Sequence, residues 1–186
     1  MKPIKRITQL IAALALCLPL ISNGDQTDQR LEQLFQTLRT SQDATVLGET
    51  EASIWEIWYA SGREEIDGKM LEAAELVRTG KLAAAESIYS AVIDEAPGFS
   101  EGWNRRATVR FYQSNYDGSL EDIEQTLKLE PRHFGAFWGL GMILGSQRDY
   151  QRAISAFEKL LEIKPHASDA RPRIELLKQE LAKQSV

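Results

Sequence analysis

The amino-acid sequence predicts an all-α protein in which antiparallel helix pairs stack side by side. Pro97, Pro131 and Pro165 follow one another at a constant interval of 34 residues, and a fixed period of this length indicates a repeat architecture. Within each interval, apolar residues recur at the spacing of two amphipathic helices. The segments before and after the intervals show helical spacing too, so the whole chain is expected to be helical.

Composition and charge indicate a globular protein and argue against one that binds nucleic acid. The chain is 43% hydrophobic and 26% charged, which is typical of a globular domain, and its formal net charge is -5. Beyond the extreme N-terminus there is no run of Lys and Arg residues. A nucleic-acid partner is therefore not expected.

Residues 1–24 have the pattern of a secretory signal peptide. Lys2, Lys5 and Arg6 precede an apolar run over residues 10–21, and cleavage is expected after Gly24. The alternative that remains open is an uncleaved membrane anchor. Cleavage removes three positive charges and changes the net charge from -5 to -8. The expected location is outside the cytoplasm, in the bacterial periplasm.

Cysteine and histidine are scarce, and the plentiful Asp and Glu residues fall on predicted outer faces or helix starts. Cys17 is the only cysteine and lies in the apolar run, where the preceding Leu16 argues against lipidation. The two histidines, His133 and His166, follow repeat-ending prolines closely and are expected to be exposed residues of turns or helix caps. No metal site, cofactor, small-molecule substrate or catalytic residue is therefore predicted, and an enzyme is not expected.

The period divides the middle of the chain into three units, 66–99, 100–133 and 134–165. In the third unit Phe137, Leu140, Gly141 and Leu144 fall on the first helix, and Ala153 and Phe157 fall on the second. The corresponding residues of the second unit are Trp103, Arg106, Ala107, Arg110, Ser119 and Ile123, and those of the first are Lys69, Glu72, Ala73, Leu76, Ala85 and Tyr89.

With these positions the chain resembles the tetratricopeptide repeat (TPR) family, whose pattern is W-x2-L-G-x2-Y, then A-x3-F, then P. The match is strongest in the third unit and weakest in the first. The resemblance implies a right-handed superhelix of helix pairs, across roughly residues 66–165. Gly141 then marks the closest approach of two helices. The apolar stretch that contains it, residues 134–145, is expected to be a wall of the core rather than a membrane span or a phosphate loop.

Two departures from the family pattern occur together in the second unit. Arg106 stands where the family usually has Leu, and Asp122 lies at the facing position of the partner helix. The third unit has Leu140 and Ala156 at these two places. Because a buried charge is costly unless it is paired, we predict a structural ion pair between Arg106 and Asp122.

Helices are also predicted on both sides of the repeats. Residues 168–184 read as a capping helix with Ile174, Leu177 and Leu181 on its apolar face. Residues 25–62 read as a helical hairpin, either a degenerate repeat or an N-terminal cap. We expect this hairpin to dock on the first unit through Trp55 and Trp58.

The resemblance implies that the first helix of each unit lines a concave groove, which in TPR proteins binds peptides or helices of partners. The positions in this sequence are Met70, Ala74, Val77, Arg78, Glu101, Asn104, Thr108, Phe111, Tyr112, Trp138, Met142 and Ser146, with Gly135 and Gly145 leaving room for a ligand backbone. The Lys, Asn and Arg residues by which co-chaperone members grip a C-terminal carboxylate are largely missing. An apolar, aromatic groove remains, with Phe111, Tyr112, Trp138 and Met142 as candidate anchors.

The sequence therefore favours a periplasmic adaptor or scaffold that binds a peptide or helix of another envelope protein. The alternative is a structural homo-oligomer or assembly spacer in which the groove is covered by the N-terminal hairpin or by a second copy of the chain.

Overall fold

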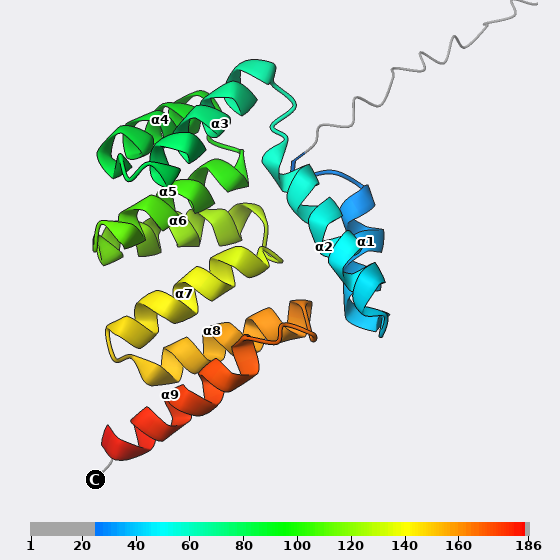
Figure 1. The fold of residues 1–186 in the computed structure, drawn as a ribbon, viewed down its shortest axis with the longest axis vertical. Coiled ribbons are helices and arrows are strands. Elements are labelled where there is room, and N and C mark those ends of the chain that lie inside the picture. Colours follow the sequence, from blue (N-terminus) through cyan, green and yellow to red (C-terminus); the bar gives the residue numbers. More distant parts are fainter. Residues whose placement is uncertain (1–24, 185–186) are drawn as a thin grey trace, which may run out of the picture.

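The computed structural model describes residues 25–184, so the predicted signal peptide lies outside the described residues (Figure 1). The described part contains helices and no strands, which confirms the predicted all-α fold. None of its helices is long and apolar enough to cross a membrane. The helices are α1 (Arg30–Thr40), α2 (Ala44–Tyr59), α3 (Glu64–Arg78), α4 (Leu82–Glu95), α5 (Ser100–Tyr112), α6 (Tyr116–Leu129), α7 (Phe134–Ser146), α8 (Tyr150–Ile163) and α9 (Ala170–Gln184).

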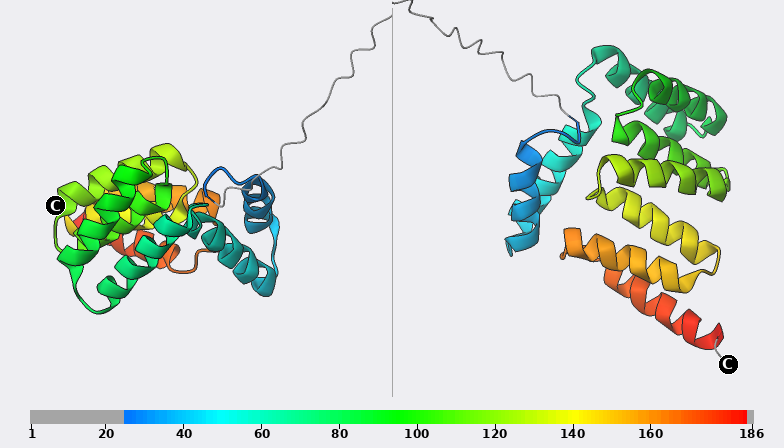
Figure 2. Two further views of the ribbon diagram at one scale, coloured as in Figure 1. Left: turned by 90° about the horizontal axis from the view of Figure 1, so that it is seen from above. Right: turned by 180° about the vertical axis from the view of Figure 1, so that it is seen from behind.

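Helices α3 to α8 form three antiparallel pairs, α3 with α4, α5 with α6 and α7 with α8. Each pair also packs on the next through α4 with α5 and α6 with α7, so the pairs stack into one continuous body (Figures 1 and 2). Helix α9 lies on α8 in the place that the first helix of a further pair would take. Its apolar face is buried there through Ile174 and Leu177.

Small residues allow the two helices of a pair to approach closely. A Cβ atom on Gly141 would lie 2.6 Å from the Phe157 ring, so only glycine fits between α7 and α8 at this point. In the second pair Ala107 takes the equivalent place, and its carbonyl accepts a hydrogen bond of 2.7 Å from the Ser119 hydroxyl. The repeat positions inferred from the sequence are thus the contact points of the helix pairs.

The turns between the helices of a pair share one backbone conformation. Gly80, Ser114 and Arg148, spaced by the repeat period, have φ angles of 75°, 62° and 62°. The residue after each one donates a backbone hydrogen bond to the carbonyl five positions before it, as from Asn115 to Arg110 at 2.8 Å. This is the hydrogen bond of a Schellman motif, which ends a helix with a residue in the left-handed conformation.

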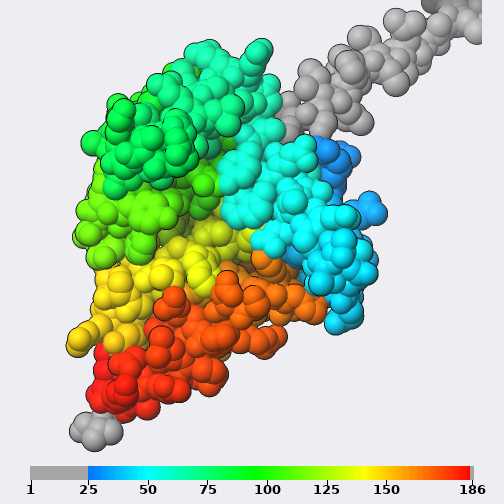
Figure 3. Space-filling model, in the orientation of Figure 1, coloured from blue at the N-terminus to red at the C-terminus, as the bar shows by residue number. Residues whose placement is uncertain are grey.

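The N-terminal hairpin, α1 and α2, does not dock on the first unit, so that prediction was wrong. It lies alongside the stack and packs on α5, α7 and α8 (Figures 1 and 2). Figure 3 shows the hairpin atoms in contact with the middle and lower part of the stack. Trp58, fully buried, shares one hydrophobic core with Phe134 and with residues of α8 and α9.

The physical reason for this placement is the shape of the start of α7. A Cβ atom on Gly135 would lie 2.8 Å from the Trp55 ring, so the missing side chain provides the space that Trp55 fills. Trp55 also meets Phe134 edge to face, with ring centroids 5.2 Å apart. Helix α3, by contrast, begins with Glu64, Glu65 and Asp67 and offers no matching aromatic surface.

Candidate protein-binding groove

Six of the predicted groove residues line one cavity of about 270 Å³ between α5 and α7, which we call the groove cavity. They are Asn104, Thr108, Phe111, Tyr112, Trp138 and Met142. Ser119 and Ile123 of α6 complete the lining together with small and apolar residues of α5 and α7. No charged side chain lines it. The cavity can therefore receive apolar groups and offers a few hydroxyl and amide groups for hydrogen bonds.

The aromatic side chains of the groove cavity differ in how firmly they are held. Trp138 contacts the Phe157 ring edge to face, with centroids 5.2 Å apart. The Phe111 ring contacts the rings of Tyr112 and Tyr116, with centroid distances of 5.9 and 5.8 Å. Tyr112 is 59% exposed, so its ring is available to a partner. Trp138 and Phe111 form a fixed surface, and Tyr112 stands at its edge.

Several predicted groove residues do not line the groove cavity, so their assignment to it was wrong: Met70, Ala74, Val77, Arg78, Glu101, Gly145 and Ser146. Met70 is 7% exposed and lines a separate cavity of about 520 Å³ between the end of α2 and α3, together with Tyr59 and Leu71. Glu101 is fully buried in the protein interior. Met70 belongs to the hydrophobic core of the first helix pair, with Ile66 and Tyr89. Glu101 is buried against His133, on which Trp58 of the hairpin stacks.

His133 is fully buried, which contradicts the expected exposure; His166 is exposed as expected. The Nδ1 atom of His133 accepts a hydrogen bond of 3.1 Å from the Ala136 backbone N–H and so caps the start of α7. Its Nε2 atom therefore carries the proton and donates to the Glu101 carboxylate at 2.9 Å. His133 is thus held as a neutral imidazole with both ring nitrogens engaged.

The Glu101 carboxylate is the centre of a buried polar cluster. Besides the hydrogen bond from His133, this carboxylate accepts a hydrogen bond from the Asn104 amide at 3.0 Å. It also forms an ion pair with the Arg105 guanidinium. Burial raises the pKa of the Glu101 carboxyl above its ordinary value, and the hydrogen bond from His133 opposes this effect. Burial also lowers the pKa of Arg105 to about 10.

This cluster attaches the hairpin to the stack. The Trp58 ring stacks on His133 with centroids 4.2 Å apart, and the Arg105 guanidinium lies 4.6 Å from the Tyr59 ring centroid. This buried cluster was not predicted from the sequence, although the repeat register could have indicated that His133 is buried. Phe99, one repeat before His133, is a core residue with 4% exposure, so the repeat register itself places position 133 in the interior.

The structure contains the ion pair between Arg106 and Asp122. The Arg106 Nε and Nη2 atoms donate to the two Asp122 carboxylate oxygens at 2.9 and 2.8 Å. The Asp122 side chain is 1% exposed. Its Oδ2 atom also lies 3.1 Å from Nη1 of Arg110, which forms a second ion pair. Ser90 of the preceding pair accepts a further hydrogen bond from Arg106 at 3.0 Å. The pair therefore connects α5 to α6 and to α4, and its role is structural.

Within residues 25–184, no group of three or more His, Cys, Asp or Glu side chains is arranged to hold a metal ion. The side chains of Glu101, Asn104, Ser119, Asp122 and His133 are buried and engaged in the contacts described above.

Comparison with known proteins supports this architecture. Residues 104–168 match the family model described as tetratricopeptide repeat. A TPR repeat-containing protein of Rhizobium etli is 35% identical over 154 residues, covering 83% of this chain and 76% of the relative.

Solved TPR domains have the same fold. The Sgt2 TPR domain from Aspergillus fumigatus superposes with a TM-score of 0.62 at 22% identity, over 66% of this chain and 83% of that one. The first TPR of Spaghetti (RPAP3), bound to an HSP90 peptide, superposes with a TM-score of 0.61 at 19% identity, over 63% and 93%. The repeat period, the stacked helix pairs and these relatives together show that the chain belongs to the tetratricopeptide repeat family.

Proposed function

We propose that this protein is an exported adaptor that holds a segment of another envelope protein in the groove cavity between α5 and α7. The observation that carries the proposal is the set of aromatic and apolar side chains that converge there, with Tyr112 still exposed. The related fold of the Spaghetti domain holds a peptide, which supports a protein partner. The N-terminal pattern of the sequence supports export.

The lining of the groove cavity favours an apolar contact as the main source of affinity. Aromatic side chains at the centre of an interface commonly supply most of its binding energy, because they bury a large area with little loss of conformational freedom. Trp138 is already fixed by Phe157, so it loses little entropy on binding. The hydroxyl of Thr108 and the amide of Asn104 can orient the backbone of the segment.

The hairpin does not take the place of this partner. Trp55 covers Gly135, which is one of the residues that line the groove cavity, but Trp138 and Met142, further along α7, line it as well. Tyr112 remains more than half exposed with the hairpin in place. If a second copy of the chain covers the groove cavity instead, a pull-down recovers the chain itself rather than a different protein.

A pull-down from the native envelope tests the proposal. The Tyr112→Ala, Trp138→Ala double variant is expected to keep its helical circular dichroism and to lose the partner. Val46→Ala, at an exposed site on α2, is the matched control and is expected to retain it. Recovery of the same partner by the double variant would overturn the proposal. Recovery of the chain itself as the sole partner would favour the homo-oligomer.

A further inference from the structure

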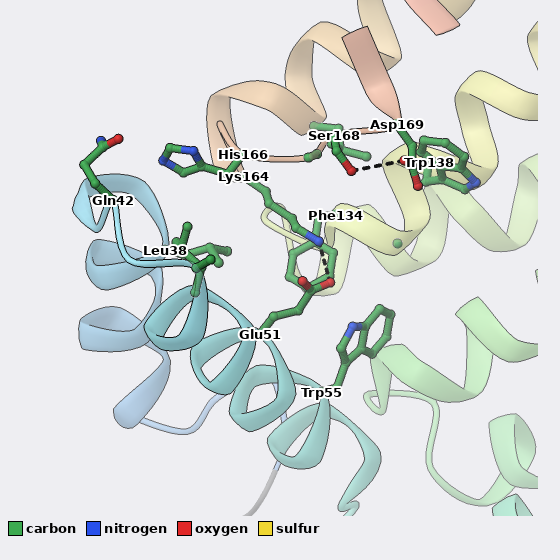
Figure 4. Close-up of a pocket in the computed structure, with 16 residues that line it drawn as sticks. Leu38, Gln42, Glu51, Trp55, Phe134, Trp138, Lys164, His166, Ser168 and Asp169 are labelled. Carbon is green, nitrogen blue, oxygen red and sulfur yellow. Dashed lines mark hydrogen bonds and ion pairs between the residues drawn. The ribbon is translucent and has the colours of Figure 1, made fainter. Parts of the chain in front are cut away.

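A second and larger cavity adjoins the groove cavity. It measures about 660 Å³ and lies between the hairpin, the start of α7, the end of α8 and the loop before α9; we call it the hairpin cavity (Figure 4). Gly135 and Trp138 line both cavities. A segment bound in the groove cavity therefore needs to pass only Trp138 to reach the hairpin cavity.

The hairpin cavity combines aromatic walls with charged groups. Trp55, Phe134 and Trp138 supply the aromatic surface. The Lys164 ammonium pairs with Glu51 at 2.5 Å and lies 5.4 Å from the centroid of the Phe134 ring (Figure 4). These contacts satisfy both charges, so Lys164 and Glu51 attract a charged ligand only weakly. They do show that this surface accommodates an ammonium group between a carboxylate and an aromatic face.

Asp169 is the charged residue of the cavity that remains available. Its carboxylate accepts a hydrogen bond of 3.1 Å from the Ser168 hydroxyl, and within residues 25–184 no basic side chain forms an ion pair with it. Asp169 is exposed and lies on the Trp138 side of the cavity (Figure 4). An indole face beside an unpaired carboxylate is a suitable environment for a Lys or Arg side chain.

Building on the proposed function, we propose that the bound segment carries a basic residue next to its apolar anchor. The anchor enters the uncharged groove cavity, and the basic side chain crosses the face of Trp138 and reaches the Asp169 carboxylate. The net charge of -8 that follows removal of the signal peptide attracts such a segment over a longer range. Arg suits the site better than Lys, because its planar guanidinium stacks on an indole while it pairs with a carboxylate.

Selection from a phage-displayed library of random dodecapeptides tests this inference. Wild-type protein is expected to enrich peptides with an aromatic or aliphatic residue close to Arg or Lys. Asp169→Asn is expected to keep the apolar preference and lose the basic one. The control Glu158→Gln, at an exposed acidic residue of α8, is expected to give the wild-type result. The best basic peptide should bind Asp169→Asn up to about fivefold more weakly by calorimetry, the effect of losing one exposed ion pair.

The outcomes separate this inference from the proposed function. If the Tyr112→Ala, Trp138→Ala variant enriches the same peptides as wild type, the groove cavity is not the site and both fail. If wild type enriches apolar peptides without a basic residue, or with an acidic one, the groove stands and the charge preference is overturned. A basic preference that persists in Asp169→Asn also overturns the inference, because another group must then supply it.

Discussion

Trp58 of the hairpin lies flat on His133, with ring centroids 4.2 Å apart and planes inclined by 9°. The same imidazole caps α7 through Nδ1 and donates to the buried Glu101 carboxylate through Nε2. One side chain thus connects the hairpin, the third helix pair and the second. This relationship explains why the hairpin lies beside the middle of the stack.

The role of His133 predicts the effect of replacing it with the residue found one repeat earlier. His133→Phe keeps an aromatic ring under Trp58 but removes one of the hydrogen-bond donors of the buried Glu101 carboxylate, and is expected to lower the free energy of unfolding by about 1–3 kcal/mol. Urea denaturation followed by tryptophan fluorescence measures this. Adding Glu101→Gln should recover part of the loss, since a neutral amide is cheaper to bury than a carboxylate. A fully stable single variant would contradict the assignment.

The ion pair in the second helix pair predicts a compensating double change. Asp122→Ala leaves Arg106 without its main partner and is expected to cost about 1–3 kcal/mol of the free energy of unfolding. The Arg106→Leu, Asp122→Ala double variant reproduces the Leu140 and Ala156 combination of the third pair and should be more stable than the single variant. Thermal and urea unfolding check both. An unchanged melting temperature in Asp122→Ala would refute the energetic role of the pair.

The contact at Gly141 predicts opposite effects for two Gly→Ala changes. Gly141→Ala places a methyl group against the Phe157 ring and is expected to destabilise the fold by about 1–3 kcal/mol. Gly68→Ala, in α3, meets no atom within 4 Å and should stabilise it by about 0.5–1 kcal/mol through helix propensity. A melting temperature that rises in Gly141→Ala as it does in Gly68→Ala would show that the close approach of α7 and α8 is unimportant.

The turns between paired helices allow the protein to be stabilised. Ser114 and Arg148 have positive φ angles, a conformation that costs a residue with a side chain about 1 kcal/mol and costs glycine much less. Ser114→Gly and Arg148→Gly are each expected to raise the free energy of unfolding, up to that amount. Gly80→Ala, at the equivalent turn of the first pair, should lower it. Chemical denaturation measures the free energy of unfolding of the three variants. If the two glycine substitutions lowered it, the positive φ angles of Ser114 and Arg148 would not be a source of strain.

The sequence was sufficient to predict the helix pairs and most of the groove, because both follow from a local period. Once Pro97, Pro131 and Pro165 set the register, the side chains of α5 and α7 that share the groove cavity could be assigned. The position of the hairpin could not be predicted in this way. It depends on contacts such as Trp55 with Phe134, between residues far apart in the sequence and outside the repeat register. Glu101 was misplaced for the same reason, because it is buried against His133, on which Trp58 of the hairpin stacks.

Site-specific photocrosslinking can show whether a partner segment occupies the groove cavity. A benzophenone amino acid replaces Tyr112 at the groove, or Glu121 at an exposed position of α6 as the control, in the full chain in its native envelope. We expect an adduct from position 112 that mass spectrometry maps to one apolar segment of a different protein, and no such adduct from position 121. An equal adduct from both positions, or adducts only with the chain itself, would show that no partner segment occupies the groove cavity.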